Sequence, residues 1–92
     1  MVGRVTAEVI VRMWEVRAER AGFADLISWV CDTALPELEH NPLHISSEVF
    51  SSTDNRLVVI SKWRASPVSL PEPPPRMLAR TPHVWDFTQV DR

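Results

Sequence analysis

The pattern of hydrophobic and polar positions along the chain predicts four β-strands and one long helix. Apolar and polar side chains alternate, or β-branched and aromatic residues gather, in residues 8–17, 43–51, 57–63 and 83–90, as is typical of strands. Between the first two of these segments apolar residues recur at helical spacing, which predicts a helix over residues 22–39. Its buried stripe is expected to contain Phe23, Ile27, Val30, Ala34 and Leu38, with Leu26 and Cys31 on the edge.

Two residues of this predicted helix do not fit the simple pattern. Pro36 lacks a backbone N–H and its ring collides with the preceding turn, so we expect a kink near the end of the helix. Trp29 lies off the apolar stripe, and we expect it to face solvent, a partner subunit or a ligand.

The connecting segments predict how these elements are joined. Residues 52–56 (STDNR) have turn chemistry, which predicts a hairpin between the second and third strands. Residues 65–75 contain five prolines, so this segment should be extended and held against the surface, with at most one helical turn in residues 76–80. The predicted fold class is therefore α+β: a ferredoxin-like four-stranded antiparallel sheet with one long helix and a degenerate, proline-rich second helix.

The length of the chain bounds its organisation. A chain of 92 residues forms a single domain, residues 1–92. Both faces of the first strand are largely apolar, with Arg12 as the exception that needs a partner or access to water. Because one helix covers only one face of the sheet, we expect a homodimer in which a second copy covers the other face.

Composition and charge exclude several classes of function. The formal net charge is −2 and no basic block is present, so no nucleic-acid partner is expected. No apolar run approaches the roughly 20 residues of a membrane span, and the N-terminus has no signal-peptide core. Cys31 is the single cysteine, and we expect it to be a core residue. These features predict a cytoplasmic protein without membrane association.

Few residues are candidates for chemistry. His40 and His44 are four residues apart, but Pro42 lies between them, so exposed turn histidines are favoured over a metal site and no metal is expected. His83 precedes the last strand and is either a general base or a histidine at the strand end without a task. Trp14, Trp63 and Trp85 lie on predicted strands, where they either fill the core or line a pocket for a flat ring.

Several segments together resemble the antibiotic-biosynthesis monooxygenase family. They are VIVRMWEV in the first strand, the helix beginning at Gly22-Phe23, the stretch HNPLHISSEVFSSTDNRLVVISKW, and the closing WDFTQV, so the likeness spans residues 8–90. Trp63, in SKWRAS, occupies the position of a tryptophan typical of the family. The resemblance implies a dimeric α/β barrel in which two sheets meet face to face, with a pocket between sheet and helices in each subunit. Some members oxidise anthrones to quinones with molecular oxygen and no cofactor, and others degrade haem.

The resemblance thus implies a cofactor-independent oxygenase acting on an aromatic polyketide-like or polyphenolic secondary metabolite. Its partners would be a second copy of the chain, a small aromatic substrate and molecular oxygen. The proline-rich segment replaces most of the family's second helix, and the histidine and asparagine of haem-degrading members have no counterpart, so haem degradation is not expected. Two alternatives remain open: a polyketide cyclase or isomerase using the same pocket, and a non-catalytic dimeric accessory protein.

The residues expected to act in this chemistry fall into two groups. Those expected to contact the substrate are Trp63, Trp14, Trp85, His44 and Phe50. Those expected to take part in catalysis are Arg12 and Arg76, with Arg64 as a further choice, as stabilisers of the developing anion, and His83 as the base, with His44 as the alternative base.

Overall fold

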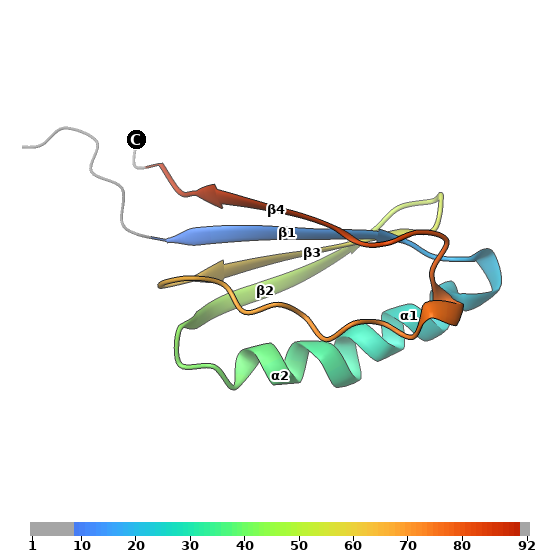
Figure 1. The fold of residues 1–92 in the computed structure, drawn as a ribbon, viewed down its shortest axis with the longest axis horizontal. Coiled ribbons are helices and arrows are strands. Elements are labelled where there is room, and N and C mark those ends of the chain that lie inside the picture. The colour runs from blue at the N-terminus through green and yellow to red at the C-terminus, as the bar shows by residue number, and fades with distance from the viewer. Residues whose placement is uncertain (1–8, 91–92) are drawn as a thin grey trace, which may run out of the picture.

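A four-stranded antiparallel sheet, covered on one face by a helical segment, forms the body of the molecule (Figure 1). The computed structural model describes residues 9–90. The strands are β1 (Ile10–Arg17), β2 (His44–Ser51), β3 (Arg56–Trp63) and β4 (His83–Thr88), and their order across the sheet is β2-β3-β1-β4. The predicted α+β class, antiparallel sheet and covering helix are confirmed. The strand order is compatible with a ferredoxin-like fold.

The predicted helix is confirmed, and it consists of four consecutive pieces. A 3-10 turn, η1 (Arg20–Gly22), leads into α1 (Phe23–Trp29), a π-helical stretch η2 (Val30–Ala34) and α2 (Leu35–Glu39). At the end of η2 the Leu35 N–H donates to the Val30 carbonyl, five residues back. Pro36 follows directly, and its ring would collide with the carbonyl four residues back in a regular α-helix. The wider π turn makes room for this ring.

Burial along the helical segment follows the predicted stripe through the π turn. Val30, Ala34 and Leu38 are buried as expected, and Leu35 beside them is 8% exposed. Cys31 is exposed, and the prediction that it belongs to the core is wrong. Trp29, expected to lie away from the stripe, is half-buried and packs against the core.

The core lies between the sheet and the helical segment. In β3 the burial alternates along the strand: Leu57, Val59, Ser61 and Trp63 are buried, while the residues between them are partly exposed. This alternation is expected of a strand with one face against a core. The main members of the core are Trp14, Val16, Leu26, Val30, Leu35, Leu38, Leu57, Val59 and Trp63.

Residues 65–75, which we call the proline strap, connect β3 to β4 and run alongside the helical segment on the same side of the sheet (Figure 1). Their regular structure is confined to the beginning of a 3-10 turn, η3 (Pro75–Met77), so a second helix is not confirmed. After the strap, the chain is fixed to the end of β1 by two backbone hydrogen bonds, from Glu19 N–H to the Met77 carbonyl and from Ala79 N–H to the Arg17 carbonyl.

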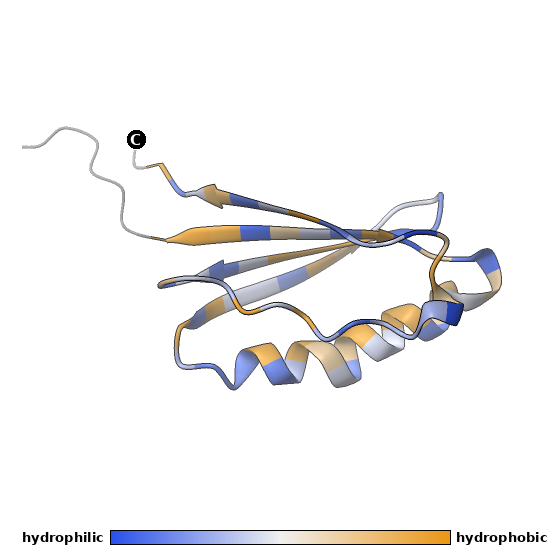
Figure 2. Cartoon of the chain, in the orientation of Figure 1, coloured by the Kyte–Doolittle hydropathy of each residue, from blue (hydrophilic) through white to orange (hydrophobic). Residues whose placement is uncertain are grey.

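The second face of the sheet, which we call the open face, carries apolar side chains that the helical segment does not cover. Strand register and alternation place on it Val11, Met13, Phe50, Val58, Ile60, Trp85 and Phe87. Phe50, Trp85 and Phe87 are 48%, 44% and 53% exposed. Figure 2 shows that hydrophobic positions occur on all four strands. Within residues 9–90, no helix is long and apolar enough to span a membrane.

Candidate functional site

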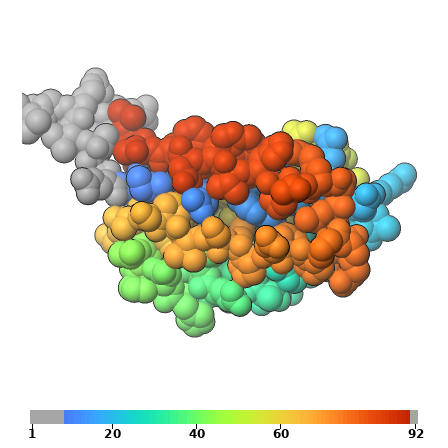
Figure 3. Space-filling model, viewed as in Figure 1, coloured from blue at the N-terminus to red at the C-terminus, as the bar shows by residue number. Residues whose placement is uncertain are grey.

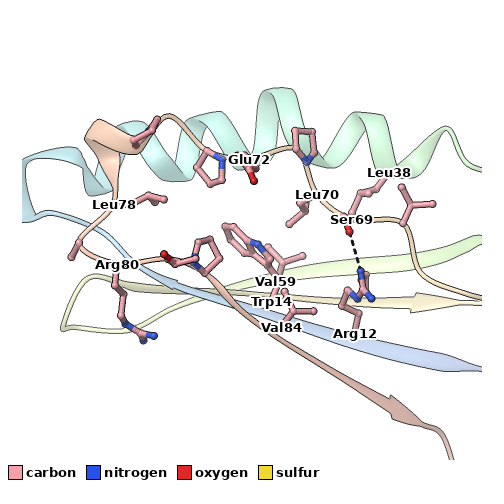
Figure 4. A pocket seen from close by; sticks show the side chains of 18 residues that line it. Arg12, Trp14, Leu38, Val59, Ser69, Leu70, Glu72, Leu78, Arg80 and Val84 are labelled. Atoms are coloured by element: carbon pink, nitrogen blue, oxygen red, sulfur yellow. Dashed lines mark hydrogen bonds between the residues drawn. The ribbon is translucent and has the colours of Figure 1, made fainter.

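A cavity of about 600 Å³ lies between the helix-covered face of the sheet and the proline strap (Figure 4). In the space-filling view, part of β1 (blue) is visible between β4 (red) and the proline strap (gold to orange) (Figure 3). The sheet contributes Arg12, Trp14, Val59, Ser61 and Val84 to the lining, and α2 contributes Leu38. The other wall is Val68, Ser69, Leu70, Pro71, Glu72, Pro73, Pro75, Leu78, Ala79, Arg80, Thr81 and Pro82. Ligand pockets usually measure between about 300 and 1,000 Å³, so the cavity is large enough for a small organic molecule.

Trp14 supplies the aromatic wall of this cavity. It lies in the middle of β1, directly opposite Val59 on β3 and Val84 on β4, so its ring is held between two aliphatic neighbours on the same face. The side chain is only 6% exposed, which keeps the indole in place. The accessible part of the indole, with Val59 and Val84 beside it, gives the cavity an apolar wall that a flat aromatic ligand can contact.

Arg12 lies two residues before Trp14 in β1, on the same face of the sheet, and brings a positive charge to the cavity. Its Nε donates to Asp86 Oδ1 at 2.8 Å and its Nη2 donates to Asp86 Oδ2 at 2.9 Å, which forms a bidentate pair across β1 and β4. Nη1 donates a longer bond of 3.5 Å to Ser69 Oγ on the strap. The bonds to Asp86 raise the pKa of Arg12, and the same bonds lower the pKa of Asp86. Asp86 is therefore the partner of Arg12, which the sequence analysis expected to need either a partner or access to water.

Glu72 is the one carboxylate, and no histidine is present, among the described residues that line the cavity. Glu72 lies on the strap wall, across the cavity from Trp14 (Figure 4). Hydroxyl groups are supplied by Ser61, Ser69 and Thr81. The Ser61 oxygen already accepts a hydrogen bond from Trp63 Nε1 at 2.9 Å, so its own hydrogen remains available to a neighbour.

Trp63 and His44 form a second group, behind the cavity wall. Trp63 is 0% exposed and is part of the core. The ring of His44 meets the Trp63 ring edge-on at a centroid distance of 5.2 Å, and His44 Nε2 lies 2.7 Å from Ser47 Oγ. Neither side chain lines the cavity. Their predicted role in contacting a substrate has no geometric support in this cavity.

His83, Trp85 and Phe50 form the third group of predicted residues, on the open face. The rings of His83 and Trp85 are 5.6 Å apart and nearly perpendicular. The sheet separates all three from the cavity, so they are not brought together with Arg12 and Trp14. Arg76 belongs to η3 and is exposed, and it does not line the cavity either.

Arg80 lines the cavity, but its guanidinium leads away from it (Figure 4). Nη2 donates to Glu15 on the open face, at 2.6 Å from Oε2. Glu15 is 7% exposed and also pairs with Arg56 Nε at 2.8 Å. Two arginines thus compensate this buried carboxylate, and the charge of Arg80 is engaged there. In the described part of the chain, no three His, Cys, Asp or Glu side chains are placed to hold a metal ion.

The Arg12–Asp86 pair predicts a pH dependence of stability. The folded-state pKa of Asp86 is lowered by Arg12, so the pair contributes fully above the unfolded-state pKa of about 3.9, and the contribution is lost as the pH falls through the folded-state value. Asp86→Asn should therefore lower the free energy of unfolding at pH 7 by under about 1 kcal/mol, since the Asp86 side chain is 43% exposed. Urea titrations of both proteins at pH 7 and pH 3 would measure this. A difference that is unchanged at the lower pH would contradict it.

The arrangement as a whole joins an aromatic wall, a charge-paired guanidinium and a carboxylate in one cavity. The sequence predicted that Arg12 and Trp14 lie on the same face, because they are two residues apart in one strand. Glu72 was missed, because it lies in LPEPPP, where prolines leave no periodic signal. Comparison of the chain with family models, with curated proteins and with solved structures finds no match.

Proposed function

We propose that this chain binds a flat aromatic molecule in the cavity and, as a homodimer, oxygenates it without a cofactor. The proposed substrate is an aromatic polyketide-like or polyphenolic secondary metabolite. The observation that carries the proposal is the cavity itself, in which the Trp14 ring and the Arg12 guanidinium face a common space of about 600 Å³. A flat ring system held against Trp14 and its aliphatic neighbours would bring a phenolic or ketone oxygen within reach of Arg12.

The proposed reaction needs little from the protein beyond binding and proton transfer. For an anthrone, a base removes a proton from the reactive CH2 group, and the resulting carbanion passes one electron to oxygen. The carbon radical and superoxide combine to a peroxide anion, which takes the proton back from the base to give a hydroperoxide, and the hydroperoxide loses water to leave a carbonyl group. One anthrone and one oxygen molecule thus give one quinone and one water. The protein must favour the deprotonated substrate and exclude bulk water.

The lining residues divide these tasks among them in the proposal. Arg12 Nη1 would donate a hydrogen bond to the substrate oxygen on which negative charge develops, as electrostatic stabilisation requires. Glu72 would accept the proton, because it is the carboxylate on the wall across from Trp14. His83 and His44, the bases expected from the sequence, lie outside the cavity, so we assign the task to Glu72.

The open face supports the homodimer in this proposal. Three strands of eight residues and one of six, about 4.8 Å apart, span roughly 500 Å² in projection. Two such faces packed together would bury at least about 1,000 Å², which is the lower limit for a specific interface. A two-fold axis through the open face would cover Phe50, Trp85 and Phe87 of both copies at once. The two sheets would then form the dimeric α/β barrel.

A non-catalytic role is the second candidate, and one observation favours it. No histidine lies among the described residues that line the cavity, so the commonest general base is missing. In this reading the cavity binds an aromatic molecule and releases it unchanged. A cyclase or isomerase would use the same cavity with Glu72 moving a proton and without oxygen.

Oxygen uptake with an anthrone in metal-free buffer tests the proposal. Wild-type protein should accelerate uptake over the spontaneous rate, with one oxygen consumed per anthrone. Glu72→Gln should lower the rate by about 100-fold, since a positioned base contributes 10²–10⁴. Glu37→Gln, at an exposed position on α2, serves as the matched control and should leave the rate unchanged. Uptake equal to the spontaneous rate, with the anthrone bound, would point to the binding protein. Conversion of the substrate without uptake would point to the cyclase.

A further inference from the structure

The positive charge of the Arg12 guanidinium is compensated by the Asp86 carboxylate before any ligand enters the cavity. Asp86 occupies the two N–H groups on one side of Arg12, with bonds of 2.8 and 2.9 Å. The pair is a directly opposed cross-strand pair of β1 and β4, so the sheet itself fixes its geometry. Bidentate pairing of this kind fixes the orientation of the guanidinium as well as its charge. Arg12 therefore offers the cavity a directed hydrogen-bond donor, and most of its net charge is compensated.

The remaining charged groups around the cavity do not favour an anion. Arg80 is engaged by Glu15 on the open face at 2.6 Å. Glu72 lines the cavity, and no ion pair that involves it is found within residues 9–90. With Arg12 and Asp86 taken together as neutral, the charge that remains in the lining is that of Glu72, an exposed side chain, and it is negative.

Ser69 marks the place that a ligand oxygen would take. Its hydroxyl accepts from Arg12 Nη1 at 3.5 Å, at the long limit of a hydrogen bond, whereas the two bonds to Asp86 are short. A carbonyl or amide oxygen inside the cavity can replace this weak acceptor without disturbing the pair with Asp86.

From these contacts we infer that the cavity selects neutral aromatic ligands with a carbonyl, amide or hydroxyl oxygen over anionic ones, and that Asp86 determines this specificity. The inference rests on the proposed binding of an aromatic molecule in this cavity, and it concerns the ligand as it enters. In the proposed oxygenation the substrate becomes an anion only as Glu72 takes up its proton and loses its own charge, so the net charge in the cavity does not change. Asp86 acts through Arg12: it cancels the charge that would attract a carboxylate and holds Nη1 toward the cavity. Without its negative charge, the same guanidinium would become an anion site.

Two ligands of equal shape and different charge test the inference: 2-naphthamide and 2-naphthoate. Calorimetric titration of the full chain at pH 7 should give at least about tenfold tighter binding of the amide, the size of effect expected for one uncompensated charge at a partly screened site. Asp86→Asn keeps the shape of the side chain and should remove the preference, with naphthoate gaining about tenfold so that the two affinities become similar. Asp86→Ser should remove the preference in the same way, which guards against an effect specific to asparagine.

Matched controls locate the effect. Asp54→Asn removes the same charge from the exposed hairpin turn and should leave both affinities unchanged. Val84→Trp fills the cavity from β4 and should abolish binding, whereas Thr88→Trp, on the same strand face and outside the lining, should not.

The outcomes separate this inference from the proposed function. If both ligands bind equally well to wild type and to Asp86→Asn, and Val84→Trp blocks both, the cavity is confirmed and the selectivity is overturned. If neither ligand binds, or Val84→Trp has no effect, the cavity is not the site and both proposals fail. Selectivity for the amide in a protein that consumes no oxygen supports the inference and overturns the oxygenase.

Discussion

Replacing Trp63 with alanine is expected to lower the free energy of unfolding by about 3–5 kcal/mol, the range for removing a large buried aromatic side chain. Among residues 9–90, Trp63 is the largest side chain that is completely buried, and it lies at the end of β3, where the sheet packs on the helical segment. Small domains have a total stability of about 5–15 kcal/mol, so much of the margin would be lost. Urea denaturation followed by circular dichroism measures the change.

Trp63→Phe is the matched control, because it keeps most of the apolar volume and removes the indole N–H. It should cost about 1–2 kcal/mol, since the buried Ser61 hydroxyl, which is 3% exposed, loses its donor. Ser61→Ala in the Trp63→Phe background should then cost little more, because neither partner of the hydrogen bond remains. A loss under 1 kcal/mol for Trp63→Ala would show that Trp63 does not join the two layers.

The sheet could be predicted from the sequence because its alternation is the direct result of burial on one side. In β3, Leu57, Val59 and Trp63 face the core, and the residues between them face the other way. The predicted strand bounds agree with the structure within one or two residues, apart from Glu8, which lies outside the described residues. Turn chemistry also located the hairpin, in which Asn55 adopts a positive φ of 62°, a conformation that asparagine tolerates well.

The buried side of the helical segment was predictable on both sides of the π turn. Val30, Ala34 and Leu38 of the predicted stripe are all buried. The buried side also includes Leu35, which the pattern did not indicate, and it leaves Cys31 in solvent. Pro36 indicated that the helix would be disturbed, but a proline in a helix can be accommodated by a kink or by a wider turn. The choice between them depends on how the helix packs on the sheet.

The site was predictable in part, because alternation assigns faces within one strand and not between strands. It places Arg12 with Trp14, and His83 with Trp85. Whether the two pairs lie on the same face of the sheet depends on the register between β1 and β4. In the structure Trp85 is the cross-strand partner of Met13, so it lies on the other face of the sheet from Trp14. A shift of one residue in register would have brought Trp85 to the cavity. The proline strap has no hydrophobic periodicity, so the sequence pattern did not indicate that Glu72 and Ser69 line the cavity.

The proposed dimer should be broken by a single charge on the open face. Phe87→Glu places a carboxylate at a position that is 53% exposed in the monomer and would be covered by a second copy. Because a two-fold interface contains every substitution twice, two unpaired charges would be buried. At about 2 kcal/mol or more for each, the dissociation constant should rise by at least about 1,000-fold. The monomer itself should remain folded, since the side chain lies outside the core.

Sedimentation velocity at micromolar concentration measures the association, and Val68→Glu is the control. Val68 is also an exposed apolar residue, at 41%, but it lies on the strap side of the sheet, so its substitution should leave the dimer intact. Equal weakening by both substitutions would indicate a general loss of stability. A wild-type chain that sediments as a 10.5 kDa monomer would show that the open face needs no second copy, and the barrel would be excluded. The cavity, built within one chain, would still be open to the ligand tests described above.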